Sequence, residues 1–111
     1  MSSPVSAVDI SDMSQLLNMQ QHAEEASQLL KAIANDKRLL ILCYLTQGES
    51  SVGNMVEALG MGQSSLSQHL AVLRSESLVQ TRREAQTIYY RLSEGPALNI
   101  MKTLYQIYCA K

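Results

Sequence analysis

Polar side chains that could hydrogen-bond to DNA gather on one face of a predicted helix over residues 63–74. Leu66, Leu70 and Leu73 recur at i, i+4 and i+7 and define the buried face of this helix. The opposite face carries amides, small hydroxyls and an imidazole, from Gln63, Ser64, Ser65, Ser67, Gln68 and His69. Such side chains can approach base edges without bulk, as a helix in the major groove requires. Alternatively, this face only meets water.

A shorter helix is predicted just before it, over residues 51–59, where apolar residues again recur at helical spacing. Ser50 or Ser51 can cap its start. Gly60 and Gly62 then interrupt the helical pattern, because glycine tolerates the positive φ of a sharp turn. The two helices together predict a helix-turn-helix.

The net charge of −1 argues weakly against a nucleic-acid partner, but the charges are unevenly distributed. Residues 1–62 carry three Lys or Arg against seven Asp or Glu, whereas residues 63–91 carry four arginines against two glutamates. We expect Arg74, Arg82 and Arg83 to hold DNA phosphates. So few arginines would bind weakly in one subunit, and a dimer would double the phosphate contacts.

A β-hairpin is predicted directly after the helix-turn-helix. Residues 78–83 and 87–92 are rich in β-forming residues and alternate in polarity, with a short turn at 84–86. A hairpin in this position describes a wing whose arginines could grip phosphates or the minor groove. Equally, the hairpin could only cover the core.

The remaining helices suggest how the domain assembles. Helices are expected over residues 14–34, 37–47 (capped by Asp36 and ended by Gly48) and from Pro96 to about Cys109. The first and last carry more apolar residues than a small core needs, so we infer that they pair across a twofold axis. The predicted fold is mainly α with a β-hairpin, a winged helix-turn-helix of order α-α-α-α-β-β-α. Residues 1–12 would form a flexible segment and residues 13–111 a single DNA-binding and dimerisation domain.

Composition limits the cellular setting. The 111 residues suffice for one domain. The sequence contains no run of about 18 apolar residues, so we expect no membrane span. The start of the chain lacks the basic and apolar regions of a secretory signal. We therefore expect a cytoplasmic protein with reduced thiols and no membrane partner.

Three segments, residues 29–45, 51–79 and 82–93, closely resemble the ArsR family of winged-helix repressors. The most specific match runs from Ser64 to Leu73, which fits the recognition-helix pattern S-x-x-S-x-H-L-x-x-L. The resemblance implies a homodimer that binds a pseudo-palindromic operator in double-stranded DNA and releases it when an inducer acts. Many members sense metals, but residues 51–59 contain no cysteine and the last helix contains no histidine. Since a zinc site needs about four ligands, we expect no metal or cofactor, although a metal-responsive repressor remains an alternative.

Cys43 and Cys109 resemble the cysteine pair of one subgroup, the BigR-, SqrR-, HlyU- and YgaV-like sensors of persulfide and oxidants. This resemblance implies that a reactive sulfur species or oxidant joins the two thiols within one subunit as a disulfide or polysulfide. Such a link would close a loop of about 66 residues, worth roughly 4 kcal/mol in the chain-entropy model.

A protein with these cysteines could have two other functions, of which one remains open. The protein could be a constitutive DNA-binding module in which Cys43 is a buried hydrophobe and Cys109 an incidental thiol. A thiol enzyme is not expected, because neither cysteine lies in a Cys-x-x-Cys motif or beside an acid–base group. The operator, the physiological inducer and the choice between repression and anti-repression cannot be read from the sequence.

Overall fold

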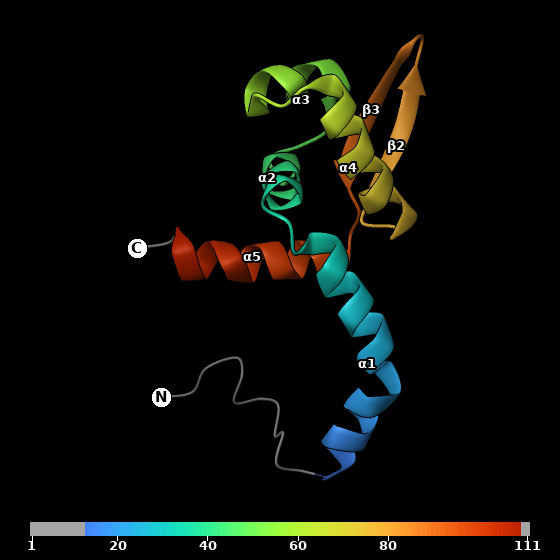
Figure 1. Cartoon of the computed structure of the whole chain (residues 1–111), viewed down its shortest axis with the longest axis vertical. Coiled ribbons are helices and arrows are strands. Elements are labelled where there is room, and N and C mark those ends of the chain that lie inside the picture. Colours follow the sequence, from blue (N-terminus) through green and yellow to red (C-terminus); the bar gives the residue numbers. More distant parts are fainter. Residues whose placement is uncertain (1–12, 110–111) are drawn as a thin grey trace. The chain divides into compact units, whose positions relative to one another are not determined.

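The computed structural model describes residues 13–109 (Figure 1). The chain divides into two compact units, Met1–Lys31 and Ala32–Lys111. The predicted flexible segment over residues 1–12 lies outside the described residues. The described part of the first unit belongs to one helix, α1 (Met13–Ile33), whose last two residues are part of the second unit.

Helix α1 exposes a series of large apolar side chains. Among residues 13–31 none is buried, whereas Ala32 and Ile33 at the helix end are. The exposed apolar residues are Met13, Leu16, Leu17, Met19 and Leu30. An apolar face of this extent on a helix usually signals a partner surface.

The second unit contains the predicted elements in the predicted order. Its helices are α2 (Asp36–Leu45), α3 (Val52–Leu59), α4 (Gln63–Ser75) and α5 (Pro96–Tyr108), and its hairpin consists of β2 (Val79–Glu84) and β3 (Thr87–Leu92). A short strand not predicted from the sequence, β1 (Ser50–Ser51), pairs antiparallel with β3 on the edge that β2 leaves free. The sheet therefore has the order β1-β3-β2. The mainly helical winged fold expected from the sequence is thereby confirmed.

The core lies between α2, α3, α4 and the base of the hairpin. Six side chains are essentially inaccessible to solvent: Ile41, Leu42, Met55, Leu66, Leu70 and Leu73. The leucines at the i, i+4 and i+7 positions of α4 therefore face inward, so the polar face of α4 is turned outward. Helix α2 contributes Ile41, Leu42 and Leu45 to the core, whereas Leu40 on its other side is exposed.

Local hydrogen bonds set the helix ends. Asn35, not Asp36, caps α2: its Oδ1 accepts from the backbone N–H groups of Lys37 and Arg38 at 2.9 and 3.1 Å. Ser51 caps α3 by accepting from the N–H of Asn54. Gly60, with φ of +66°, ends α3 in the left-handed region, where glycine has no steric penalty. These ends fix the turn that sets the course of α4.

Candidate nucleic-acid interface

The six polar residues predicted to read DNA lie along the outer side of α4. Gln63, Ser64, Ser67 and Gln68 are exposed, while Ser65 and His69 are half-buried. Gly62 starts the helix without a side-chain cap, so the first backbone N–H groups of α4 remain open to an anion. We refer to α4 as the recognition helix and to the β2–β3 hairpin as the wing.

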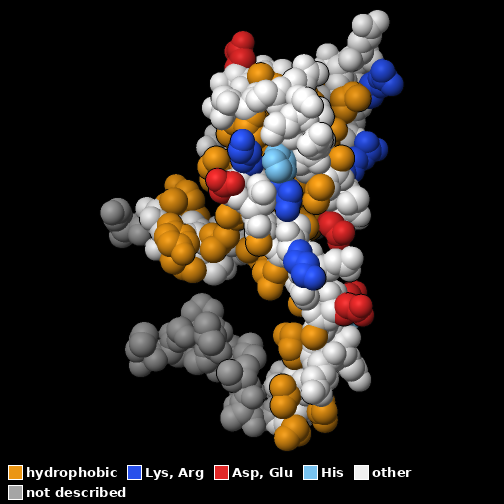
Figure 2. Space-filling view, viewed as in Figure 1, with side chains coloured by type: hydrophobic (Ala, Val, Ile, Leu, Met, Phe, Trp, Pro, Cys, Tyr) orange, Lys and Arg blue, Asp and Glu red, His pale blue; other side chains and the backbone are white. Residues whose placement is uncertain are grey.

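A side chain that sequence reasoning missed, Arg38 of α2, contacts the recognition helix. Its Nη1 lies 3.2 Å from Nδ1 of His69, and its Nε donates to the carbonyl oxygen of Ala32 at 2.6 Å. Figure 2 shows a histidine beside Lys or Arg side chains on the surface over α2 and α4. The polar side of α4 is therefore in contact with α2.

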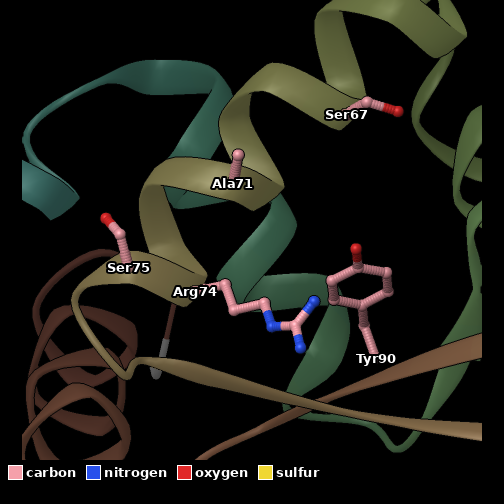
Figure 3. A pocket seen from close by; sticks show the side chains of 5 residues that line it. All are labelled: Ser67, Ala71, Arg74, Ser75 and Tyr90. Carbon is pink, nitrogen blue, oxygen red and sulfur yellow. The ribbon is translucent and has the colours of Figure 1, made fainter.

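An open groove of about 440 Å³ separates the recognition helix from the wing. In Figure 3, Arg74 extends from α4 toward Tyr90 of β3, while Ser67 and Ala71 lie further along the same helix face. None of the hydrogen bonds or ion pairs within residues 13–109 uses the side chains of Arg74 or Tyr90. Donor groups from both elements thus face one groove, and Tyr90 is a lining residue that the sequence analysis did not select.

Arg82 of the wing is bound to two carboxylates. Its Nε donates to Oε2 of Glu49 and its Nη1 to Oε1 of Glu84, both at 2.7 Å. The guanidinium also stacks 4.5 Å from the ring centroid of Tyr89. These carboxylates offset its charge, and the contact with Glu49 ties the wing to the residue just before β1. Arg83, one residue further along β2, is exposed and enters none of the ion pairs in the described part of the chain.

This arrangement predicts how Glu49 titrates. The hydrogen bond from Arg82 favours the carboxylate and lowers the pKa of Glu49 below its ordinary value of 4.5. Since the folded-state pKa of Glu49 is depressed, the Glu49–Arg82 ion pair contributes its full stability above the ordinary pKa of a glutamate. That contribution is lost as the pH falls through the folded-state pKa. A carboxyl-carbon NMR titration should give a midpoint below 4.5, which Arg82→Gln should raise. Arg83→Gln is the matched control and should leave the midpoint in place; a wild-type midpoint at or above 4.5 would contradict the ion pair.

The two cysteines are free thiols on helices that contact each other. Cys43 is half-buried in α2, and Cys109 is exposed directly after the last residue of α5. Helices α2 and α5 pack together, which brings the elements that carry the thiols into one part of the second unit. Over residues 13–109, no three His, Cys, Asp or Glu side chains cluster closely enough to hold a metal ion.

Helix α5 also exposes large apolar side chains, most of all in its last turn. Tyr105, Ile107 and Tyr108 are 59%, 62% and 78% exposed, although Ala97 and Met101 of the same helix are buried. Figure 2 shows the hydrophobic surface gathered along α5. One side of α5 therefore closes the core while another has no contact within the described residues that would cover it.

An outward polar face on the second helix of a helix-turn-helix, followed by a hairpin and a groove lined with donors, defines a winged helix-turn-helix DNA-binding protein. Residues 35–81 match the model described as "Bacterial regulatory protein, arsR family". The biofilm growth-associated repressor of Xylella fastidiosa is 43% identical over 94 residues, covering 85% of this chain and 82% of the relative. The chain belongs to the ArsR family of transcriptional regulators and is not an enzyme.

Two further comparisons agree. The transcriptional activator HlyU of Vibrio cholerae is 47% identical over 94 residues, covering 85% of this chain and 87% of HlyU. The solved structure of reduced HlyU from Vibrio cholerae superposes with a TM-score of 0.78, covering 83% of this chain and 97% of that one. Within residues 13–109, none of the helices combines the length and hydropathy that a bilayer crossing demands.

Proposed function

We propose that this regulator is a homodimeric repressor that reads a pseudo-palindromic operator and releases it when reactive sulfur species or oxidants join Cys43 to Cys109. The observation that carries the DNA-reading part is the exposed polar face of α4 beside Arg74 and Arg83, which enter none of the ion pairs within residues 13–109. The sensing part is carried by two free thiols, Cys43 in α2 and Cys109 directly after α5, because these two helices pack together.

The DNA contacts follow from exposure and partners. The groove-reading set is Gln63, Ser64, Ser65, Ser67, Gln68 and His69. Arg74 and Arg83 hold phosphates, since both are exposed and neither is neutralised by a carboxylate among residues 13–109. Arg82, the third arginine expected to hold a phosphate, is assigned the weakest contact, because Glu49 and Glu84 already pair with its guanidinium.

These roles predict different effects for two substitutions, measured on a duplex that the wild-type protein selects from a randomised library. Arg83→Ala should weaken binding to all sequences and reduce the salt slope by about two for a homodimer, one phosphate per subunit. Gln68→Ala should instead relax sequence preference, by about 1–3 kcal/mol at the base pair it reads. Arg82→Ala is the matched control for charge and should change the salt slope least. Unchanged binding after either of the first two substitutions removes that residue from the interface.

The exposed apolar residues of α5 support a homodimer, with α1 supplying a second apolar surface. Neither surface is covered by the chain's own described residues, and water contact with so much apolar area is unfavourable. A second copy of the chain offers an equivalent pair of helices, as a twofold interface requires. Pairing two subunits also places two recognition helices about one DNA turn apart.

The thiol chemistry proceeds in two steps. A persulfide donor transfers a sulfur atom to the exposed Cys109, giving Cys109–S–SH and the donor's thiol. The Cys43 thiolate then attacks the inner sulfur and expels hydrogen sulfide, which leaves a disulfide; a longer donor chain leaves a polysulfide. The link ties the core helix α2 to α5 and alters the spacing of the two recognition helices. One solved structure of HlyU from Vibrio cholerae is described as reduced, and this description supports thiol oxidation state as the property that is sensed.

Intact mass spectrometry tests the chemistry directly. Donor treatment should give a monomer mass that is two hydrogens lower, or higher by whole sulfur atoms less two hydrogens, with both cysteines closed to alkylation. An unchanged mass with two alkylatable thiols would favour a constitutive DNA-binding protein with inert cysteines.

The relatives include both a repressor and an activator, so release of DNA could raise or lower transcription of a given gene.

A further inference from the structure

We propose that Arg38 is a positioning residue for DNA reading: it fixes the imidazole of His69 as a hydrogen-bond donor at its Nε2 atom. The proposal rests on the proposed DNA-contact role of α4, and it assigns His69 a single hydrogen-bonding function. Arg38 itself lies on α2, behind the recognition helix, and touches DNA only through His69.

The guanidinium of Arg38 contacts both Ala32 and His69. Its Nε donates to the carbonyl oxygen of Ala32 at 2.6 Å, and its Nη1 lies 3.2 Å from Nδ1 of His69. The backbone N–H of the same residue is bound to Oδ1 of Asn35 at 3.1 Å. Arg38 is half-buried, so its side chain has few alternative positions. The fork of the guanidinium therefore presents one N–H to a fixed point on α4.

The hydrogen-bond donors of Arg38 then determine the tautomer of the His69 imidazole. A guanidinium carries only donors, so Nδ1 of His69 must accept with its lone pair. In a neutral imidazole the other nitrogen carries the hydrogen, which makes Nε2 a donor. None of the hydrogen bonds within residues 13–109 uses Nε2 of His69, and His69 itself is half-buried among the polar residues of α4.

A donor at this position selects its partner on DNA. It can bond to a phosphate oxygen or to the acceptors N7 and O6 of guanine, N7 of adenine or O4 of thymine. It cannot accept from the amino groups of adenine or cytosine. Because the ring is neutral, its contribution adds no counterion release and leaves the salt slope unchanged. Lysine at position 38 would keep the positive charge but lose the planar fork that joins Ala32 to His69.

The first test needs no substitution in Arg38. Long-range proton–nitrogen correlation spectra of the wild-type protein without DNA should show an unprotonated Nδ1 and a protonated Nε2 for His69, identified by its loss in His69→Ala. His22 is the internal control, because its Nδ1 lies 3.0 Å from Oε1 of Glu25, an acceptor that requires the hydrogen on Nδ1. A His69 ring with its hydrogen on Nδ1, or an even mixture of both tautomers, would overturn the proposal.

The second test is a double-mutant cycle on the duplex selected by the wild-type protein. Arg38→Lys and His69→Ala should each weaken binding about tenfold, and the double variant should be no weaker than His69→Ala alone. The salt slope should match wild type in all three. Additive losses, or a lower slope in Arg38→Lys, would mean that Arg38 acts on DNA without His69. Failure of the wild type to bind any duplex would instead refute the proposed function, while the tautomer measurement would still stand.

Discussion

Cys43→Ser should remain bound to the selected duplex when a persulfide donor releases the wild-type protein. A coupling free energy of about 1–3 kcal/mol is usual for such switches, so the donor should weaken wild-type binding about 5- to 150-fold. The variant lacks the thiolate that closes the bridge to Cys109 and should show none of this loss. Fluorescence anisotropy of the labelled duplex, with and without donor, measures both affinities.

Cys109→Ser should show the same insensitivity, because either thiol alone can be modified but cannot form an intrasubunit link. Under reducing conditions both variants should bind as wild type does, which separates a sensing defect from a folding defect. If Cys43→Ser is released by the donor as readily as wild type, Cys43 has no part in sensing and the bridge is wrong.

Ile107→Glu should convert the dimer into a monomer and weaken binding to the palindromic duplex by about 10²- to 10⁴-fold, the gain that linking two binding modules provides. Ile107 is 62% exposed on α5, so a charged side chain there causes no loss of packing within the subunit. In a dimer interface the same carboxylate would be buried without a partner. Sedimentation velocity gives the oligomeric state, and anisotropy gives the affinity.

Gln106→Glu is the matched control, since it introduces the same charge one residue earlier at another exposed position of α5. It should leave the dimer and the DNA affinity nearly unchanged if the interface uses the apolar side of the helix. A dimer that persists in Ile107→Glu would show that this part of α5 is outside the interface.

Periodicity explains why the outward polar face of α4 could be predicted from the sequence. The leucines of α4 recur every three or four residues, so their burial fixes which side of the helix faces outward. The wing was equally predictable, because its strands alternate and are joined by a short turn. Both features depend on residues that are close together along the chain.

Contacts between distant residues could not be predicted in this way. Arg38 meets His69 across 31 positions and Arg82 meets Glu49 across 33, and each pairing depends on how two elements cross after folding. Sequence reasoning consequently did not show that Arg82 pairs with two carboxylates, and it overlooked Arg38. The strand β1 was missed because two residues are too few to show an alternating pattern. Asn35 and Asp36 are both good caps, and only the backbone geometry selects Asn35.

Helix α2 carries Arg38 and Cys43 about one and a half turns apart on a single rigid rod. A displacement of α2 caused by a bond at Cys43 would also displace the guanidinium of Arg38, which orients the imidazole of His69. Oxidation of Cys43 would then be coupled to the base preference of His69 within one subunit. Treatment with a persulfide donor would in that case reduce the sequence specificity of DNA binding as well as the affinity for all sequences.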